Sequence, residues 1–573
     1  MKKFYWITAS VIALTAFPLA ASPANPFSTQ RLSEVDRQLA SDAFQGRGTA
    51  APIEPTVIHY IANQFAAAGA QPGGDIVNGK RTWFQNVPLL QSEIVGTPQI
   101  SLDENGMRVP LRQGPDIAVL APLNGAKQVD IENAPLVFAG YGVSAPERGW
   151  NDFKGEDLHG KVLVVLVNDP DFEAAPGEPV AGKFGGKAMT YYGRWTYKYE
   201  EAARQGAAGV IIVHEAAPAS YGWDVVQNSN TNAQFDIVRE NPAAAHTAFE
   251  SWIQRPLAVQ LFQRSGLDFE QAKLAARRAD FKPIPLKATL SAHFTARPQV
   301  ITSHNVVAIL PGTAHPDETV IYSAHWDHLG VGKPDARGDR IYNGAVDNAT
   351  GVSELIEQAH VLAHEPRTER SIVFLAVTGE EKGLLGSGYY AAHPLYPLAK
   401  TVADINVDAW IPDGPQKNFT IRGTAKLDLA DDIVAEGKRQ GRYFTPDPHP
   451  ETGGFYRSDH FPFAKMGVPA VSFSEGLDLV NGGTARGEAI AQEYNSEHYH
   501  QPSDEWQPNW DWSGVAQNAE LLHQVGLRLA NSREWPNWSN DSEFRAARDQ
   551  SAAERGTTLP TPVRARPGKG ERG

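Results

Sequence analysis

The sequence predicts an α/β fold with a mixed, largely parallel central sheet flanked by helices and an inserted β-rich domain. Residues 320–324 and 372–377 are short apolar runs, rich in β-branched side chains, as in strands buried on both faces. Between them, residues 349–363 carry apolar side chains at helical spacing. Strand, helix and strand therefore alternate as in a parallel α/β sheet. From residue 96 to residue 295, short alternating runs with many Gly and Pro indicate the inserted domain.

Acidic residues and histidines follow the predicted strands where each one ends. In open α/β sheets the binding crevice lies beyond the carboxyl ends of the strands. A further apolar run at residues 401–407 leads into an aspartate, and the motif YHQPSDEW places a histidine in a loop. The candidate site residues, in chain order, are His325, Asp347, Glu380, Glu381, Asp408 and His500.

These residue types indicate a metal site. Imidazole and carboxylate groups bind borderline divalent ions such as zinc, and an uncoordinated carboxylate beside them can accept the proton of a water. Glu380 and Glu381 fit that division, because neighbouring side chains at a strand end point to different sides. Any one of these groups alone is more typical of a solvated turn. Their serial placement at successive strand ends carries the prediction.

The ordered series resembles the co-catalytic two-zinc exopeptidases, metallopeptidase family 28, of the bacterial leucyl aminopeptidase type. The resemblance implies that His325 and Asp408 bind one zinc ion, while Glu381 and His500 bind a second. It also implies that Asp347 bridges the two ions. In the same resemblance, Glu380 is the general base that takes the proton of the attacking water.

The resemblance extends to groups around the ligands. Asp327, in HWDH, is expected to orient His325, and Asp504 is expected to orient His500. The peptide bond after the bridging Asp347 is expected to be cis, as is frequent in the family.

Two tyrosines are candidates for contacts to the substrate. Tyr499 precedes the last predicted ligand, where related enzymes often carry a phenol that polarises the scissile carbonyl. Tyr456, in FYRSDHFPF, is the alternative and the candidate substrate-binding residue. Either side chain can equally form an aromatic wall of the pocket.

The inserted segment, residues 96–295, resembles a protease-associated domain. The pieces LVFAGYGVSAP, DLHGKVLVVLVNDP and KYEEAARQGAAGVIIVHE carry that resemblance. Residues 162–167 and 210–213 are its predicted buried strands, and residues 197–205 are the predicted helix between them. Such insertions flank the active-site mouth in the family, which suggests a partial lid.

The length of 573 residues is ample for more than one domain. Residues 1–24 resemble a secretory signal peptide, with two lysines, an apolar run and small residues. The expected mature protein is exported, periplasmic or secreted, without stable membrane association. Residues 25–95 form the N-terminal segment of the peptidase domain, residues 296–535 its zinc-binding catalytic part, and residues 536–573 a disordered tail.

Composition and missing motifs exclude other classes of function. The formal net charge of −14 and the lack of a basic cluster argue against a nucleic-acid partner. The chain has no cysteine, so thiolate zinc sites, disulfides and a Cys nucleophile are excluded. It also lacks the H-E-x-x-H motif of single-zinc proteases and the G-x-S-x-G elbow of serine hydrolases.

The resulting prediction is an exported metallo-aminopeptidase that acts on peptide substrates with two zinc ions per chain. One alternative is a glutamate-carboxypeptidase-like enzyme, or a glutaminyl-cyclase-like enzyme with one zinc. A second alternative is a receptor-like protein that kept the fold without catalysis. Neither the side-chain preference nor the oligomeric state follows from the sequence.

Overall fold

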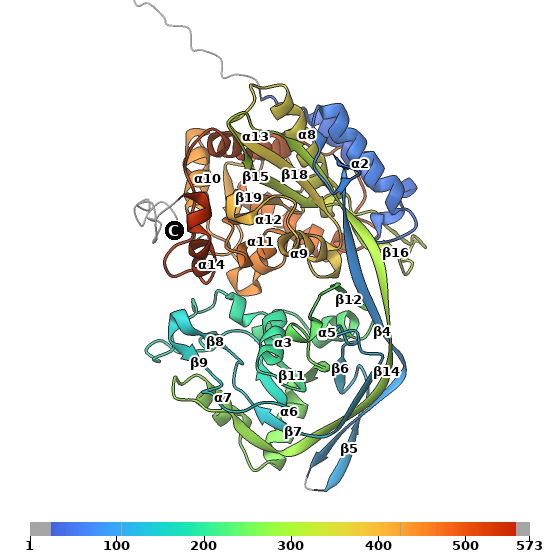
Figure 1. Cartoon of the computed structure of the whole chain (residues 1–573), viewed down its shortest axis with the longest axis vertical. Helices are drawn as coiled ribbons and strands as arrows, with labels where there is room; N and C mark the ends of the chain where they lie inside the picture. Colours follow the sequence, from blue (N-terminus) through green and yellow to red (C-terminus); the bar gives the residue numbers. More distant parts are fainter. Residues whose placement is uncertain (1–24, 105, 425, 557–573) are drawn as a thin grey trace, which may run out of the picture.

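The computed structural model describes residues 25–104, 106–424 and 426–556. Two lobes lie one above the other along the long axis of the molecule (Figure 1). Two long antiparallel strands, β4 (Phe84–Glu104) and β14 (Ile284–Leu310), run from one lobe into the other. The predicted signal peptide, residues 1–24, lies outside the described residues.

The upper lobe is built on the predicted parallel sheet. β15 (His315–His325) lies between β18 (Arg370–Val377) and β19 (Thr401–Val407) and is parallel to both. β22 (Ala470–Glu475) continues the sheet in parallel beside β19, whereas β14 is antiparallel to β18. Every residue of β18 and β19 is buried, as expected for strands covered on both faces. The predicted mixed, largely parallel α/β fold is confirmed.

Alternate side chains of β15 face helices on opposite sides of the sheet. Tyr322 donates a hydrogen bond to the carbonyl of Leu522 in α13 (Ser513–Ala530). Its neighbour Ser323 points the other way and bonds Asn406, which in turn donates to Ser458, just before α11 (His460–Lys465). Helix α8 (Thr350–Ala363) packs with α13 over the same strands.

Two helices near the amino terminus cover the outside of α8. They are α1 (Thr29–Leu39) and α2 (Glu54–Ala68). The predicted apolar face of α2 is confirmed, because Val57, Ile61 and Phe65 are all fully buried. Phe65 stacks on Phe374 of β18, so this helix is held against the sheet that carries the site.

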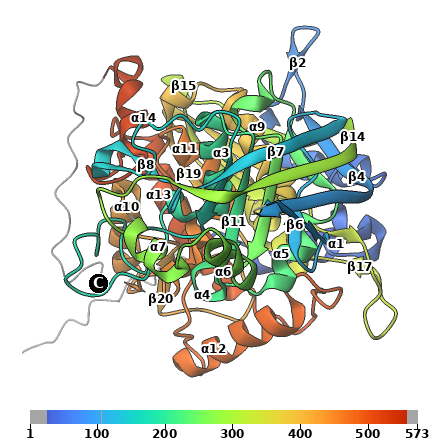
Figure 2. The same ribbon diagram turned by 90° about the horizontal axis from the view of Figure 1, so that it is seen from below.

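The lower lobe carries a second block of parallel strands, which β14 joins to the upper block in one continuous sheet. The strands of this second block are β7 (Gln128–Phe138), β10 (Val162–Leu166), β11 (Gly209–His214) and β13 (Phe249–Gln254). Helices α3 (Trp195–Arg204) and α6 (Arg255–Arg264) contact β11. Seen from below, this lobe covers the underside of the upper lobe (Figure 2). The strands and the helix predicted within 162–213 are confirmed; the assignment of the lobe to a protease-associated domain stays a prediction.

The predicted domain boundaries fall inside the two long strands. Val95 of β4 is paired with Thr295 of β14, in the middle of a ladder that continues on both sides. The two lobes are therefore joined by a continuous two-stranded ribbon. A change in composition along the chain could not reveal this, because the strands cross the boundary without a break.

The expectation of a disordered tail from residue 536 is wrong for the described part of that segment. Trp538 is buried and its indole N–H donates to the carbonyl of Gly467 at 3.0 Å. Arg548, in α14 (Arg545–Gln550), is buried and donates to the carbonyl of Thr401. A few large side chains anchor a segment whose average composition is polar. Residues 557–573 lie outside the described part of the chain.

In the described ranges, none of the helices combines the length and the apolar character that crossing a bilayer requires.

Candidate metal centre

The first half of the site lies at the carboxyl ends of β15 and β19. His325 is the last residue of β15, and Asp408 follows the last residue of β19. Because these strands are parallel neighbours, their ends meet, and Nε2 of His325 lies 3.2 Å from Oδ1 of Asp408. His325 is almost fully buried. The structure therefore brings together two residues that are far apart in the sequence, as predicted.

Asp347 lies between the two predicted ligand pairs. Its Oδ1 is 3.3 Å from Nε2 of His325, and its Oδ2 is 3.3 Å from Nε2 of His500. The two oxygens of one carboxylate thus face two different imidazoles, which is the arrangement expected of a bridging ligand. The peptide bond between Asp347 and Asn348 is cis, which confirms that prediction.

The second half of the site joins the turn after β18 to the loop before α13. Oε2 of Glu381 lies 3.2 Å from Nε2 of His500. Glu380, the preceding residue, instead lines a cavity of about 400 Å³ between the lobes. The two neighbouring glutamates therefore face different surroundings, as the sequence indicated.

The charge of this cluster explains why it would attract cations. Burial lowers the pKa of His325, but the carboxylates of Asp408 and Glu380 and the contact with Asp347 raise it well above the usual range. Burial likewise raises the pKa of Asp347, but the contacts with both histidines hold it well below its usual range. The buried carboxylates thus favour positive charge beside them, and a divalent ion at this site would supply it.

Burial and the neighbouring charges also oppose each other in setting the pKa values of the other groups. Burial lowers the pKa of His500, yet Glu381 and Asp347 raise it to about 10. Burial and the neighbouring Asp347 raise the pKa of Glu381, but His500 and His328 bring it down to about 2. Burial raises the pKa of Glu380 well above its usual range; Asp408 and Glu381 add to this effect, whereas His325 opposes it.

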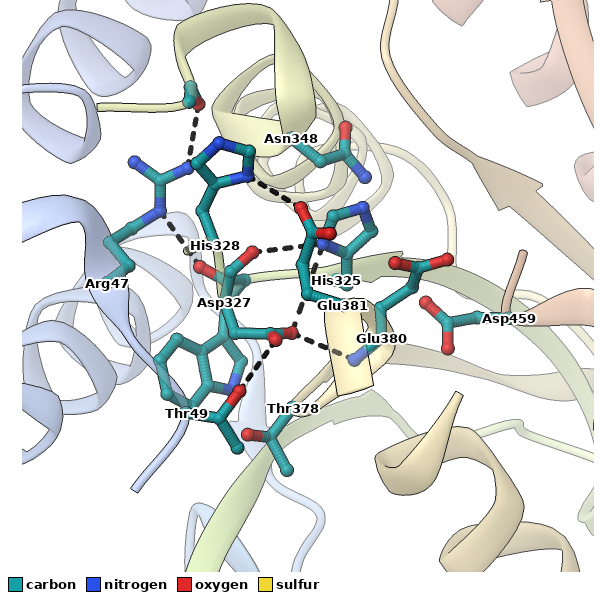
Figure 3. Close-up of polar contacts among 12 residues, drawn as sticks. Arg47, Thr49, His325, Asp327, His328, Asn348, Thr378, Glu380, Glu381 and Asp459 are labelled. Atoms are coloured by element: carbon teal, nitrogen blue, oxygen red, sulfur yellow. Dashed lines mark hydrogen bonds and ion pairs between the residues drawn. The ribbon is translucent and has the colours of Figure 1, made fainter. Parts of the chain in front are cut away.

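Asp327 supports the site, although its carboxylate does not contact His325 as closely as expected. Nδ1 of His325 is 3.0 Å from the backbone carbonyl of Asp327 and 3.9 Å from its carboxylate. The carboxylate accepts hydrogen bonds from the Thr49 hydroxyl and from the backbone N–H of Glu380 (Figure 3). Asp327 therefore ties together the ends of two strands.

The expected contact between Asp504 and His500 is wrong. The Asp504 carboxylate accepts the backbone N–H groups of Val346 and Asp347 and the hydroxyl of Tyr494. The Asp504 carboxylate thus holds the backbone at Asp347, the predicted bridging ligand, because this stretch of backbone, and not His500, lies next to it.

Two buried residues of the site were not among the predicted ones. Nδ1 of His328 lies 2.7 Å from Oε1 of Glu381, and His328 has no exposed surface (Figure 3). Arg47 donates to the backbone carbonyls of Trp326, Asn343 and Gly344, which flank the predicted ligands. His328 is the second histidine of HWDH, and Arg47 lies in the stretch GRGTA at residues 46–50. Neither motif identifies the partner that its residue contacts.

The two candidate tyrosines have different surroundings. The ring of Tyr499 stacks on His500 at 3.9 Å between centroids and is 45% exposed. Tyr456 is buried, and its hydroxyl donates to Glu543 at 3.0 Å. Tyr456 also lines the cavity that Glu380 lines. Tyr499 therefore belongs to the cluster of predicted ligands, while Tyr456 forms a wall of the cavity.

The fold and this set of side chains define an α/β protein with a candidate divalent-metal centre at the carboxyl edge of its sheet. Two groups of metal-binding residue types converge there, namely His325 with Asp347 and Asp408, and His328 with Asp347 and Glu381. Residues 305–526 match the model of Peptidase family M28. This part of the chain is a Peptidase family M28 domain.

Several known proteins are similar to parts of the chain. A probable zinc metalloprotease of Pyrenophora teres f. teres (strain 0-1) is 38% identical over 103 residues, 18% of this chain and 22% of that protein. Aminopeptidase YwaD of Bacillus subtilis (strain 168) is 30% identical over 176 residues, 30% of this chain and 35% of that protein. The matched stretches thus span well under half of either relative.

Among solved structures, the aminopeptidase from Aneurinibacillus sp. strain AM-1 is 18% identical, with a TM-score of 0.47. The similarity covers 89% of this chain and 96% of that one.

Proposed function

We propose that this protein is a metallo-aminopeptidase that binds two zinc ions and removes amino-terminal residues from peptides. The observation that carries the proposal is the position of Asp347, whose two carboxylate oxygens each lie 3.3 Å from the imidazole of a different histidine. The family match over residues 305–526 supports a peptidase. The names of the zinc metalloprotease and aminopeptidase relatives support the metal and the reaction.

The donor set fits zinc. His325 and Asp408 would hold one ion, Glu381 and His500 the other, and Asp347 both. Imidazole nitrogens and carboxylate oxygens are typical zinc ligands. When bound, such a pair of ions polarises the scissile carbonyl and makes a water nucleophilic near neutral pH. Within each ligand pair the two donor atoms lie 3.2 Å apart, which places both within reach of a single ion.

Glu380 is the best candidate for the general base. It lines the cavity next to the ligands but contacts neither histidine at ion-pair distance, so its carboxylate is free for proton transfer. Burial and the surrounding carboxylates raise its pKa well above the usual range, which favours a group that accepts a proton and then donates it to the leaving amine. Tyr499, stacked on His500, is the candidate phenol near the scissile carbonyl.

The test of this function pairs metal analysis with hydrolysis of an aminoacyl anilide panel. The same anilides with acetylated amino groups are the control. We expect about two zinc ions per chain and turnover only of substrates with a free amine. Turnover of blocked substrates would contradict aminopeptidase action and favour the carboxypeptidase-like alternative, whereas a single zinc ion per chain would favour the cyclase-like one.

Export is a separate proposal that rests on the composition of residues 1–24. Fractionation of cells expressing the full chain tests it. We expect activity in the periplasmic or secreted fraction and a mature amino terminus near residue 24. Retention of the intact chain in the cytosol would contradict export without bearing on the peptidase reaction.

A further inference from the structure

The cavity beside Glu380 has walls from both lobes. Trp195 and Ile237 come from the lower lobe, and Leu384 and Phe461 come from the upper lobe. In an aminopeptidase only one residue precedes the scissile bond, so most of a bound peptide must lie beyond it. The cavity of about 400 Å³ that Glu380 lines lies next to the candidate base and offers space for that part of the substrate.

The charges that line this cavity are unbalanced. Glu200 is paired with Lys465 at 2.8 Å, and Asp236 is paired with Arg239. Apart from the candidate base Glu380, the charged side chains that remain in its lining are two arginines, Arg194 and Arg457.

Arg194 is a buried guanidinium without a partner. It is 9% exposed, its Nε is completely covered, and it forms no ion pair or side-chain hydrogen bond with the described residues. A cation buried in this way is destabilised unless an opposite charge compensates it. Burial, followed by the repulsion of Arg457, lowers the pKa of Arg194 to about 10, so the group is still a cation at neutral pH.

Arg457 approaches the same place from the upper lobe. Its only side-chain hydrogen bond among the described residues is a long one, 3.4 Å, to the hydroxyl of Ser220 in the lower lobe. Two cations from different lobes therefore face one cavity, and neither is paired with a carboxylate of the described residues. Two neighbouring guanidinium groups of this kind form a typical binding site for a carboxylate.

We propose that Arg194 and Arg457 form a subsite for a carboxylate of the peptide substrate, so that the enzyme prefers short acidic-ended peptides to neutral ones. The proposal deepens the proposed function and rests on it. The carboxylate has two possible sources, namely the free carboxyl terminus of a di- or tripeptide, or an acidic side chain beyond the scissile bond. Both sources offer the planar pair of oxygens that a guanidinium binds.

The first experiment compares leucyl di- and tripeptides with their carboxyl-terminal amides on the zinc-loaded wild-type protein. We expect kcat/KM for the free acids to exceed that for the amides by about tenfold or more, since a charge-assisted pair is lost in the amide. If leucyl-aspartyl amide is cleaved faster than leucyl-asparaginyl amide instead, the acidic side chain is the source. Equal rates for all of these peptides would overturn the proposal.

The variants Arg194→Gln and Arg457→Gln locate the effect. We expect each to lower kcat/KM for the preferred acidic peptide about tenfold and to leave hydrolysis of leucine anilide unchanged, because the anilide has no carboxylate. Arg457→Lys should recover part of the loss. Arg278→Gln is the matched control, as its side chain is 69% exposed in the lower lobe and lies outside the cavity. If Arg194→Gln does not fold, the exposed Arg457 still decides the question.

Failure of the two proposals can be told apart. A wild-type protein that cleaves leucine anilide but ignores the carboxylate contradicts only the subsite. For a protein without turnover, calorimetric titration of leucyl-glycine and leucyl-glycinamide into Glu380→Gln protein tests the subsite directly. Binding of the acid about tenfold tighter than the amide supports it, and equal or absent binding of both overturns it.

Discussion

Nδ1 of His328 lies 2.7 Å from Oε1 of Glu381, while Oε2 of the same carboxylate faces Nε2 of His500 at 3.2 Å. His328 thus contacts one oxygen of Glu381, while the other oxygen faces the predicted zinc position. Residues that orient a metal ligand in this way typically change metal affinity by about 10- to 100-fold when they are removed.

Replacing His328 with Ala should therefore weaken zinc binding at the Glu381 and His500 position about 10- to 100-fold and leave the other position unchanged. Competition with a chromogenic chelator measures both affinities. His364→Ala is the matched control, because His364 is an exposed histidine that follows the last residue of α8, at the opposite end of that helix from Asp347. Unchanged affinity at both positions would show that His328 does not position Glu381.

Replacing Glu380 with Gln should leave the zinc content unchanged and lower kcat by about 10²- to 10⁴-fold, because the group that transfers the proton is lost. The measurement is kcat on a leucine anilide together with zinc analysis of the same sample. If turnover stays near that of the wild type, Glu380 is not the base.

Replacing Asp347 with Ala should remove both metal positions, since each of its oxygens faces a different histidine. Asp408→Ala should weaken only one position, because His325 is the one predicted ligand among the described residues that the Asp408 carboxylate contacts. Zinc analysis after gel filtration compares the two variants. Equal losses from both variants would argue against a bridging role for Asp347.

Replacing Trp538 with Ala should lower the free energy of unfolding by about 3–5 kcal/mol, because a fully packed indole is removed from the interior. Denaturant unfolding measures this. A chain shortened after residue 556 is the control and should keep the wild-type stability, since the contacts of Trp538 remain. A tail that contributes nothing would make the two proteins equally stable.

Glu354 in α8 should give a measurable pH dependence of stability. Burial raises its pKa from 4.5 to about 8, so the folded protein binds a proton that the unfolded chain has released between these values. Stability should therefore fall as the pH rises through this window, by roughly a few kcal/mol for this group. Glu354→Gln should remove that part of the loss. Melting curves of both proteins at pH 5 and pH 8 measure this. An equal loss of stability between the two pH values in the variant and in the wild type would contradict the role of Glu354.

The sequence was sufficient to predict the sheet and the residues at its strand ends. Runs such as residues 372–377 have one physical explanation, burial on both faces, and a parallel sheet brings its strand ends together. His325 and Asp408 could therefore be brought together from the sequence, and the structure has them 3.2 Å apart.

The contacts of residues that surround or support the site could not be predicted in the same way. Arg47 reaches backbone carbonyls almost 300 positions along the chain, and no local pattern encodes that approach. The same limit applies to Trp538, whose indole bonds the carbonyl of Gly467, 71 positions earlier in the chain. Arg194 was not predicted either, because the lack of a partner for its buried Nε among the described residues is visible only in a folded structure.

The most direct test of the account is crystallography of the zinc-loaded protein with anomalous diffraction at the zinc edge. We expect two anomalous peaks about 3.5–4 Å apart, one on each side of Asp347, with His325 and His500 as ligands of different ions. A single peak, or two peaks that do not share Asp347, would contradict it.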